Sequence, residues 1–367
     1  MKIPAAKKTI LYNRHIEKNG NMVSFGGYLL PIYYTSIIKE HSAVRKNAGL
    51  FDVSHMGEFI VSGNDSSTFI QKLTVNDVSS LSPGQAQYSA MCYENGGLVD
   101  DILIFKREKS YLIVVNAANI VKNLNWLNSH IDGQVSINNI SEEIELIALQ
   151  GPKAREILQP LIDIDLMDLS YFHFLDGNII GHKAMISRTG YTGELGYEIY
   201  IDPKYVINIW DAILEYGHKY GIEPAGLGCR DTLRMEMKYV LYGVDIDKNA
   251  NPIEAGLGWV VKFNKGEFLG KKALINAKKN LLRKFVCIEM MEQAIPRNGC
   301  RILVDNEVVG HITSGTMSPS LQIGMGMGYV NMPFTKKGTL LKIDIRGKEV
   351  PAMVIKGPFY KEGSLLS

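Results

Sequence analysis

Residues 86–101, AQYSAMCYENGGLVDD, contain two strand-like runs that flank an Asn-Gly pair at 95–96. An Asn-Gly pair accepts the positive backbone angles of a type I′ turn, so this stretch predicts a β-hairpin. A two-residue turn places Ala90 opposite Asp101, and it places Tyr88 diagonally from Asp101 on the same face of the sheet. The hairpin therefore predicts a tyrosine beside a carboxylate that lies within a strand.

The pairing nearer the turn follows from the same count of residues. It places Cys92 opposite Val99 and Tyr93 opposite Leu98. Because side chains alternate between the two faces of a strand, an error of one residue in this count would reverse the face of every side chain.

A third strand is predicted beyond the hairpin. The run LVDDILIFK at 98–106 is followed by REKS and then by YLIVVN at 111–116. If REKS forms a four-residue hairpin loop, Asp101 faces Asn116, whereas a slip of one residue would move Asn116 to the other face. In the first case, three neighbouring strands present Tyr88, Asp101 and Asn116 together.

The surroundings of Asp101 are apolar, since Val99, Ile102, Leu103 and Ile104 lie next to it. A carboxylate in such a strand is costly to bury unless it has polar partners or a chemical role. One interpretation is that this acid or the preceding one lies on a solvated face or caps another element. The polar neighbours that the register predicts favour a functional carboxylate.

The composition is that of an ordinary globular protein of two or three domains. The chain has 367 residues, of which 46% are hydrophobic and 21% charged, and its net charge is +2. This charge argues against a nucleic-acid surface or a polybasic membrane surface. No apolar run approaches the roughly 20 residues of a membrane span, and the N-terminus lacks the apolar core of a signal peptide. We therefore expect a cytoplasmic location.

The cysteines and histidines give no metal-binding pattern. The four cysteines are far apart in the sequence and form no CxxC pair, and the eight histidines form no HExxH motif. The cysteines are interpreted as reduced residues, mostly of the core. We predict that the chain has no metal site.

The chain contains two units in which a strand, a glycine and a helix follow one another. The first is EFIVSG at 58–63, followed by a helix that Asn64 or Asp65 caps. The second is IELIALQ at 144–150 and Gly151, followed by a helix with Pro152 at its first position. With antiparallel strands between them, these units suggest a ferredoxin-like α+β arrangement.

The last quarter of the chain is rich in short strands. From residue 284 onward they are separated by turn signals such as Asp305-Asn306 and Arg346-Gly347, which is typical of a small antiparallel barrel. Before it, residues 251–263 predict a turn followed by a strand around Trp259, and residues 203–217 predict a helix that Gly217 ends.

Further candidate site residues lie between these regions. The glycines at 190, 193 and 196 are spaced GxxGxxG, which is not a dinucleotide motif, and they predict a tight turn that lets a ligand approach the backbone. Glu198 follows in a strand, where it is either solvated or part of a site. On a helix at about 225–238, Arg230 and Arg234 are four residues apart, so one can point to a site and the other to solvent or a salt bridge. His55 is a further site-lining candidate.

Several of these stretches together resemble one family, in its order and over about residues 8–361. They include FDVSHMGEF (51–59), QAQYSAMCYENGGLVDDILIF (85–105), SRTGYTGELGYEIYI (187–201), GLGCRDTLRMEM (226–237), NPIEAGLGWVVKF (251–263) and TSGTMSPSLQIGMGMGYV (313–330). The chain is similar to the aminomethyltransferase family, the T proteins of the glycine cleavage system. It departs from the family at Tyr28, where tryptophan is common, and at YGVDID (242–247).

The resemblance implies an α+β, three-lobed folate-binding fold with ferredoxin-like sub-domains. Residues 1–280 would form two intertwined α+β lobes, and residues 284–361 a C-terminal antiparallel β-barrel. The implied reaction transfers the one-carbon unit of an aminomethyl group from the lipoyl arm of the H protein to tetrahydrofolate. It yields 5,10-methylenetetrahydrofolate, ammonia and the reduced arm, with no metal, nucleic acid or membrane involved.

The resemblance also implies roles for single residues. Asp101 matches the family's essential carboxylate, and Tyr88 and Asn116 match positions that line the same site. Glu198 matches the pterin-binding glutamate, while Tyr191 and Arg230 match further folate-site residues. Alternatives within the fold are a folate-dependent demethylase and a non-enzymatic folate-binding protein of iron–sulfur assembly. A soluble α+β protein without a folate site is a third possibility.

Overall fold

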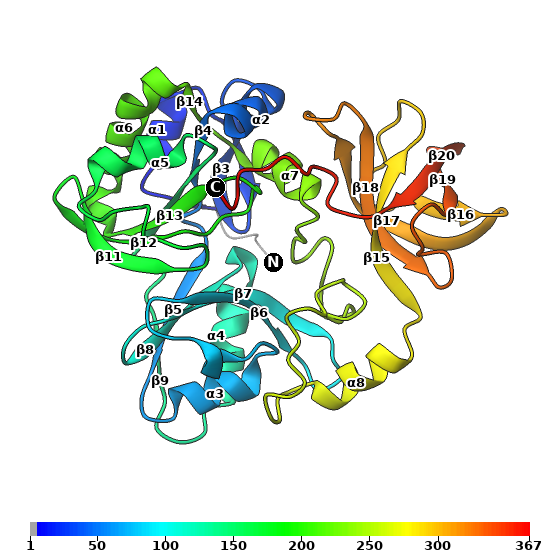
Figure 1. Ribbon diagram of the computed structural model, residues 1–367, viewed down its shortest axis with the longest axis horizontal. Helices are drawn as coiled ribbons and strands as arrows, with labels where there is room; N and C mark the ends of the chain where they lie inside the picture. Colours follow the sequence, from blue (N-terminus) through cyan, green and yellow to red (C-terminus); the bar gives the residue numbers. More distant parts are fainter. Residues whose placement is uncertain (1–5) are drawn as a thin grey trace.

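Three lobes surround a central segment in the computed structural model, which describes residues 6–367 (Figure 1). Two α+β lobes lie on one side, and a barrel lies on the other (Figure 1). Helix α7 (Leu227–Glu236) lies between the first lobe and the barrel, and α8 (Lys271–Lys279) leads into the barrel. The α+β fold with a C-terminal barrel that the sequence predicts is confirmed.

The first lobe contains a mixed six-stranded sheet and a small three-stranded sheet. The larger sheet has the order β11 (Phe174–Ile179), β12 (His182–Ser187), β13 (Gly196–Ile201), β10 (Glu145–Gln150), β4 (Ala48–Asp52), β14 (Ile222–Pro224). The smaller has the order β1 (Lys7–Lys8), β3 (Tyr28–Tyr33), β2 (Asn21–Phe25). The helices are α1 (Tyr12–Glu17), α2 (Ile37–Lys46), α5 (Ala154–Leu158) and α6 (Val206–Gly217). One face of the larger sheet buries Ile147 and Ile199 against Trp210 of α6.

The second lobe is an antiparallel five-stranded sheet. Its order is β6 (Ala86–Cys92), β7 (Leu98–Lys106), β8 (Ser110–Val115), β5 (Gly57–Ser62), β9 (Ser136–Asn139), and its helices are α3 (Ser66–Leu73) and α4 (Ile120–Ser129). One face packs Phe59 and Ile104 against these helices. The other packs toward the first lobe, where the rings of Phe105 and Tyr200 meet edge to face at 5.7 Å. Because successive side chains point to opposite faces of the sheet, the same strands contribute to a hydrophobic core on each face.

The strand register around Asp101 is the predicted one. Ala90 pairs with Asp101 across β6 and β7, and Leu103 pairs with Val114 across β7 and β8. Tyr88 pairs with Leu103, so it is the diagonal neighbour of Asp101. The prediction that the three strands present their polar residues on one face is confirmed.

The prediction for the tip of the hairpin is wrong. Of the Asn-Gly pair at the tip, only Gly96 has a positive φ, of 87°. Its backbone N–H donates to Tyr93 O at 2.9 Å. Asn95 keeps a negative φ because its side-chain Oδ1 accepts from Gly97 N at 3.0 Å. The turn is therefore one residue longer than an Asn-Gly type I′ turn, and Cys92 pairs with Leu98 instead of Val99. A bulge at that point restores the predicted register before Asp100.

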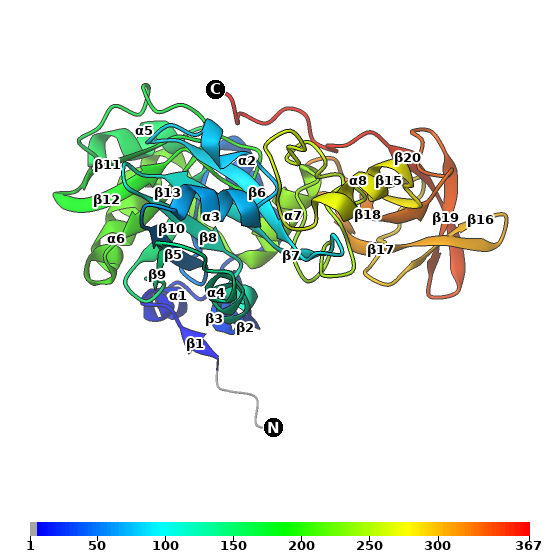
Figure 2. The same cartoon turned by 90° about the horizontal axis from the view of Figure 1, so that it is seen from below.

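The barrel closes with the order β15 (Arg283–Met290), β18 (Gly324–Asn331), β17 (Glu307–Met317), β16 (Arg301–Val304), β19 (Leu340–Ile345), β20 (Lys348–Ile355). Positive φ angles at Asp305, Asn306, Arg346 and Gly347 confirm both predicted hairpin turns. After the barrel, the C-terminal segment runs back to the first lobe (Figures 1 and 2).

Several local predictions are wrong in detail. Residues 251–263 form turns instead of a strand, and Trp259 is 64% exposed. Asp65 makes no side-chain cap to α3, because its carboxylate accepts from Gln134 N at 2.7 Å. Helix α5 begins at Ala154, so Pro152 is not its first residue. The helix predicted at 203–217 is present as α6 and ends at Gly217, but its C-cap residue is His218, and a 3-10 turn follows as far as Tyr220, before Gly221 with φ of 73°.

The remaining helical segments are short 3-10 turns: Val78–Ser80, Ala117–Asn119, Gln159–Leu161, Pro203–Tyr205 and His218–Tyr220. Among residues 6–367, no helix combines the length and apolar character that a membrane crossing would require.

Candidate active site

Asp101 is held from both sides by the strands that flank β7. Tyr88 Oη donates to Asp101 Oδ2 at 2.9 Å, and Asn116 Nδ2 donates to Asp101 Oδ1 at 2.8 Å. The side chain is partly exposed. Burial raises the pKa of Asp101, and the bonds from Tyr88 and Asn116 oppose this effect. Each carboxylate oxygen thus has one fixed donor and keeps capacity for a ligand.

The preceding residue, Asp100, was considered from sequence only as a solvated or capping acid. It is fully buried and accepts hydrogen bonds from three asparagines, as Asn119 Nδ2 lies at 2.7 Å and Asn123 Nδ2 at 2.5 Å. Asn116 donates to it through Nδ2 at 2.9 Å and through the backbone at 3.3 Å. Burial, with the charge of Asp101, raises the pKa of Asp100 to about 7. The spacing of the three asparagines, three and four residues apart, was the signal in the sequence.

A lysine from α4 lies close to the carboxylate pair. Lys122 Nζ donates to Val99 O at 2.5 Å and to Tyr242 Oη at 3.0 Å. Burial lowers the pKa of Lys122, and the charges of Asp100 and Asp101 counteract this. The pair of acids therefore has a nearby cation, which sequence reasoning did not identify.

The second group of predicted site residues gathers around β13 and α7. Glu198 is buried, and its Oε2 accepts from Thr189 Oγ1 at 2.5 Å. Burial raises the pKa of Glu198, whereas Thr189 and the charge of Arg230 lower it. The guanidinium of Arg230 lies over the ring of Tyr191 at 4.7 Å. Among the described residues, neither the Arg230 side chain nor Glu198 Oε1 has a hydrogen-bond partner.

Arg234 makes the salt bridge predicted for one of the two arginines. Arg234 is saturated, because Nη1 meets Asp245 Oδ2 at 2.5 Å and Nη2 donates to Ser314 Oγ at 2.8 Å. Arg230 is partly buried, and its donors have no hydrogen-bond partner among the described residues, so it is available to a polar ligand.

Tyr191 lies between the two groups. Its hydroxyl donates to Val240 O, and its ring stacks on Tyr239 with centroids 5.5 Å apart. Burial raises the pKa of Tyr191, and the charges of both Asp101 and Arg230 act on it. The structure therefore brings the six predicted site residues into one neighbourhood, although they come from both α+β lobes and α7.

Two aromatic or imidazole side chains border this neighbourhood. Trp259 stacks on Tyr88 with centroids 6.1 Å apart, and sequence reasoning missed it because a strand was expected there. His55 is buried between Phe25 and Tyr28, and its Nδ1 has no partner among the described residues. Burial and the charge of Arg230 lower the pKa of His55 to about 4, so the imidazole is neutral at pH 7.

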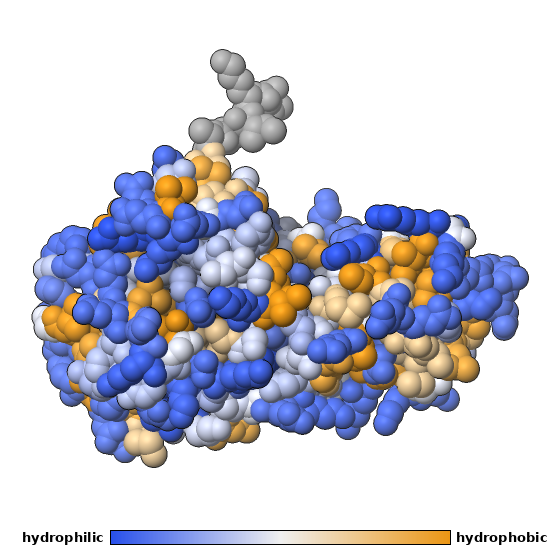
Figure 3. Space-filling model, turned by 90° about the horizontal axis from the view of Figure 1, so that it is seen from above, coloured by the Kyte–Doolittle hydropathy of each residue, from blue (hydrophilic) through white to orange (hydrophobic). Residues whose placement is uncertain are grey.

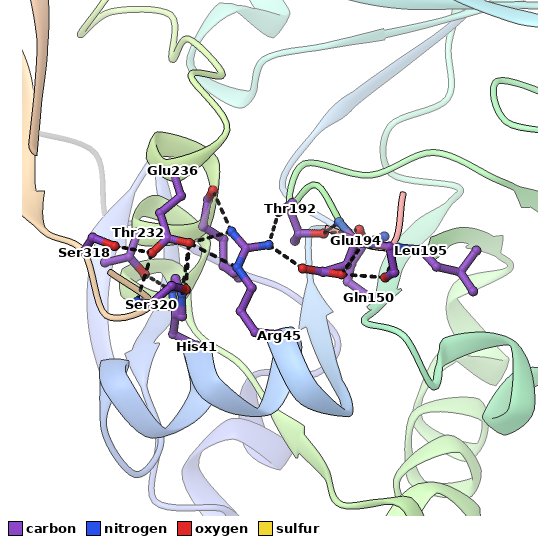
Figure 4. Close-up of polar contacts among 12 residues, drawn as sticks. His41, Arg45, Gln150, Thr192, Glu194, Leu195, Thr232, Glu236, Ser318 and Ser320 are labelled. Carbon is purple, nitrogen blue, oxygen red and sulfur yellow. Dashed lines mark hydrogen bonds and ion pairs between the residues drawn. The ribbon is translucent and has the colours of Figure 1, made fainter. Parts of the chain in front are cut away.

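A separate polar network around Arg45 and Glu236 joins the lobes (Figure 4). Arg45 of α2 donates to Thr192 O and Glu194 Oε1, both at 2.7 Å, and to Glu236 Oε2, also at 2.7 Å. Glu236 in turn accepts from the barrel, with Ser318 Oγ at 2.6 Å. We call this set the junction cluster; its members are His41, Arg45, Thr192, Glu194, Glu236, Ser318 and Ser320.

The junction cluster fixes the glycine-rich turn against α7. Its members Thr192 and Glu194 follow Tyr191, while Glu236 ends the helix that carries Arg230. The turn needs glycine, because a Cβ at Gly190 or Gly196 would lie within 2.1–2.7 Å of the Gln150 side chain. Sequence reasoning found the glycines but not the network behind them.

A hollow of about 790 Å³ lies elsewhere, beside α3. Its lining comes from α3 and residues near it, from residues 130–133 and from residues 267–269, and none of the predicted site residues contributes to it. The described residues contain no group of three or more His, Cys, Asp or Glu side chains arranged for a metal ion.

Comparisons with known proteins agree over nearly the whole chain. Residues 11–265 match the family described as GCVT N-terminal domain, and residues 283–361 match the glycine cleavage T-protein C-terminal barrel domain. The aminomethyltransferase of Bacillus subtilis (strain 168) is 50% identical over 97% of this chain and 99% of the relative. That of Geobacillus sp. (strain WCH70) is 49% identical with the same coverage.

A solved structure gives the same result. The crystal structure of glycine cleavage system aminomethyltransferase T from Bartonella henselae has a TM-score of 0.91 and 29% identity, covering 97% of this chain and 99% of that chain. Fold and sequence together define an enzyme of the aminomethyltransferase class. Within that class, the chain belongs to the glycine cleavage T-protein family.

Proposed function

We propose that the enzyme transfers the one-carbon unit of an aminomethyl group on the lipoyl arm of the H protein to tetrahydrofolate. The carbon–sulfur and carbon–nitrogen bonds of the aminomethyl group break, and bonds from carbon to N5 and N10 of the folate form. One folate proton goes to the departing amine, which leaves as ammonia, and the other goes to sulfur. The products are 5,10-methylenetetrahydrofolate, ammonia and the reduced arm, so no oxidant is needed.

The second group of site residues would bind the pterin. The open oxygen of Glu198 can accept from the ring N–H and amino group of the pterin, and such charge-assisted bonds are strong and directional. Arg230 would meet polar atoms of the folate with its free guanidinium donors, and the Tyr191 ring would provide an apolar wall. Glu198 Oε1 and the Arg230 donors have no hydrogen-bond partner among the described residues, which supports this assignment.

Asp101 would act on the reacting atoms. Its carboxylate would orient N5 of the folate toward the aminomethyl carbon and help its proton leave. It would also stabilise the iminium-like cation that develops as ammonia departs. Tyr88 and Asn116 hold the two oxygens in place, so little reorganisation is needed when the charge forms. This fixed, partly exposed carboxylate is the observation that carries the proposal.

The experiment is an assay of methylenetetrahydrofolate formation with aminomethylated H protein. Asp101→Asn and Asp101→Ala should lower turnover by about 10²- to 10⁴-fold while the fold is retained. Asp176→Asn is the matched control, because Asp176 is an exposed strand carboxylate on β11 whose one ion pair among residues 6–367 is with Arg107. Full activity in Asp101→Ala would reject the role of this residue.

The carrier is tested separately from the chemistry. If the H protein is the partner, its aminomethylated form should be used more efficiently than free aminomethyl-lipoamide at equal concentration. Equal efficiency of the two donors would reject the H protein as the partner. Failure of wild type to form methylenetetrahydrofolate with either donor would reject the proposed reaction itself.

The setting of the reaction is also a proposal. We place it in the cytoplasm, and the four free cysteines are typical of a reducing compartment. We further propose that residues 1–280 form the folate-binding part and residues 284–361 a distinct barrel domain. Leu282 between them is 81% exposed, so limited proteolysis should cut there first if the division is right.

A further inference from the structure

The proposed reaction leaves one carboxylate of the pair without a role. Asp100 is fully buried, so it touches neither folate nor the lipoyl arm. Yet it accepts four hydrogen bonds from asparagines, which is close to the full capacity of a carboxylate. A buried acid with that many donors is fixed in space, and whatever it holds is fixed as well.

Asn116 is the group that it holds next to the site. The amide nitrogen of Asn116 lies 2.9 Å from Asp100 Oδ1 and 2.8 Å from Asp101 Oδ1. An amide has two hydrogens, so one can be directed to each carboxylate. The backbone N–H of Asn116 adds a second contact to Asp100, at 3.3 Å. The direction in which Asn116 presents its second hydrogen to Asp101 therefore depends on Asp100.

We propose that Asp100 is a positioning residue, which orients the Asp101 carboxylate through the shared amide of Asn116. Asn119 and Asn123 keep Asp100 in place from the far side, because both donate to it and neither reaches Asp101. The same anchor fixes the start of α4, the helix that carries Lys122. This inference rests on the proposed role of Asp101.

A purely structural anchor would hold α4 without affecting how Asp101 titrates or reacts. Five groups face Asp101 besides Asp100, and they come from separate elements: Tyr88 from β6, Asn116 after β8, Lys122 from α4, Tyr191 from the glycine-rich turn and Tyr242 after α7. None of them changes in Asp100→Asn, so a change in the behaviour of Asp101 is attributable to Asp100.

The first test is a double-mutant cycle on turnover at the optimal pH. Asp100→Asn and Asn116→Leu should each lower kcat by about 10-fold, with the KM for tetrahydrofolate unchanged within twofold. The double variant should be no slower than either single one, because both break the same connection. A multiplied loss of about 100-fold in the double variant would overturn the connection through Asn116.

The second test is the acid limb of the pH profile of kcat. Asp100→Asn loosens the hold on the Asn116 amide, which donates to the charged form of Asp101, and should move the limb to higher pH by about one unit. Asn116→Leu removes a hydrogen bond to the charged form of Asp101 and should move it to higher pH. A lower melting temperature in Asp100→Asn with an unmoved limb would leave Asp100 merely structural and overturn the proposal.

Glu58→Gln is the matched control for both tests. Glu58 is also a buried carboxylate of the five-stranded sheet, but it makes no hydrogen bond to Asn116 or Asp101. Its replacement should leave the acid limb in place. If Asp100→Asn does not fold, Asn116→Leu alone decides, because a limb that stays or moves to lower pH overturns the proposal. Full activity of Asp101→Ala would instead reject the function on which this inference depends.

Discussion

The carboxylate pair and the junction cluster are both buried polar networks, but they arise from different parts of the chain. Asp100 takes its partners from residues 16 to 23 positions away along the sequence. Arg45 takes its partners from residues 147 to 191 positions away. The first network is thus a property of one sheet and its next helix, whereas the second exists only after the first lobe, α7 and the barrel have met.

The two networks also treat charge in opposite ways. Asp100 has only neutral amide donors, and burial raises its pKa to about 7. Burial would raise the pKa of Glu236 too, but the contacts with His41 and Arg45 outweigh it and bring that pKa to about 2. The carboxylate beside the proposed proton-transfer site is thus bound by neutral amides. The carboxylate that joins the lobes is bound by cations, which keep it charged.

The largest change in stability is expected for Arg45→Ala, and it tests the structural role of the junction cluster. Arg45→Ala leaves Glu194 and Glu236 buried without their cation, which costs about 3–5 kcal/mol of unfolding free energy. Denaturant unfolding measures it. Arg301→Ala is the control, because its pair with Asp344 is exposed and contributes only about 0–1 kcal/mol. Equal losses in the two variants would contradict a structural role for the junction cluster.

The next effect concerns ligand binding at Glu198. Glu198→Ala should weaken tetrahydrofolate by about 10- to 100-fold, since hydrogen bonds to a charged group contribute roughly 1.5–3 kcal/mol. Calorimetric titration measures the dissociation constant. Thr189→Val, which removes only the hydroxyl that orients the carboxylate, should have a smaller effect. An unchanged dissociation constant in Glu198→Ala would refute the pterin assignment.

A third effect compares two glycines with left-handed backbones. Gly193 has φ of 80°, so Gly193→Ala should lower stability by about 1–2 kcal/mol. A Cβ there would also meet the Met237 side chain and displace the turn that carries Tyr191, so folate binding should weaken. Gly96→Ala, with φ of 87°, should show the same loss of stability with unchanged folate affinity. Equal folate affinity in both variants would show that the position of the glycine-rich turn does not affect folate binding.

The smallest effects are expected in the pH dependence of stability, where the two networks have opposite signs. The pKa of Asp100 is raised from 3.8 to about 7, so its stabilisation is complete below pH 3.8 and lost as the pH rises through 7. The pKa of Glu236 is lowered from 4.5 to about 2, so its stabilisation is present above pH 4.5 and lost as the pH falls through 2.

Denaturant unfolding at several pH values checks these signs. Between pH 4 and 7, wild type should lose stability relative to Asp100→Asn as the pH rises. Between pH 4.5 and 2, it should lose stability relative to Glu236→Gln as the pH falls. The same sign for both differences would contradict the comparison.

Hydrophobic and polar side chains are mixed on the surface of the molecule. From above, hydrophobic side chains form separate patches among polar ones, including patches over the barrel (Figure 3). No single apolar band identifies a docking face in this view, so the predictions above address the interior.

The sequence by itself determined the face on which Asp101 lies. Strand alternation has a period of two, and the loop 107–110 transmits that period from β7 to Asn116. The outcome at the hairpin tip is instructive, since a turn one residue longer than expected is offset by a bulge before Asp100. The local pattern of buried and polar residues thus decided the register even where the turn type was wrong.

Only the tertiary structure decided which polar groups are satisfied and which stay open. Arg230 and Arg234 are equivalent in the sequence, four residues apart on one helix. Asp245 and Ser314, which come from distant segments, accept hydrogen bonds from Arg234. No described residue accepts a hydrogen bond from the guanidinium of Arg230. Periodicity assigns a side chain to a face, but the partners that meet it there come from other lobes, and these depend on how the lobes pack.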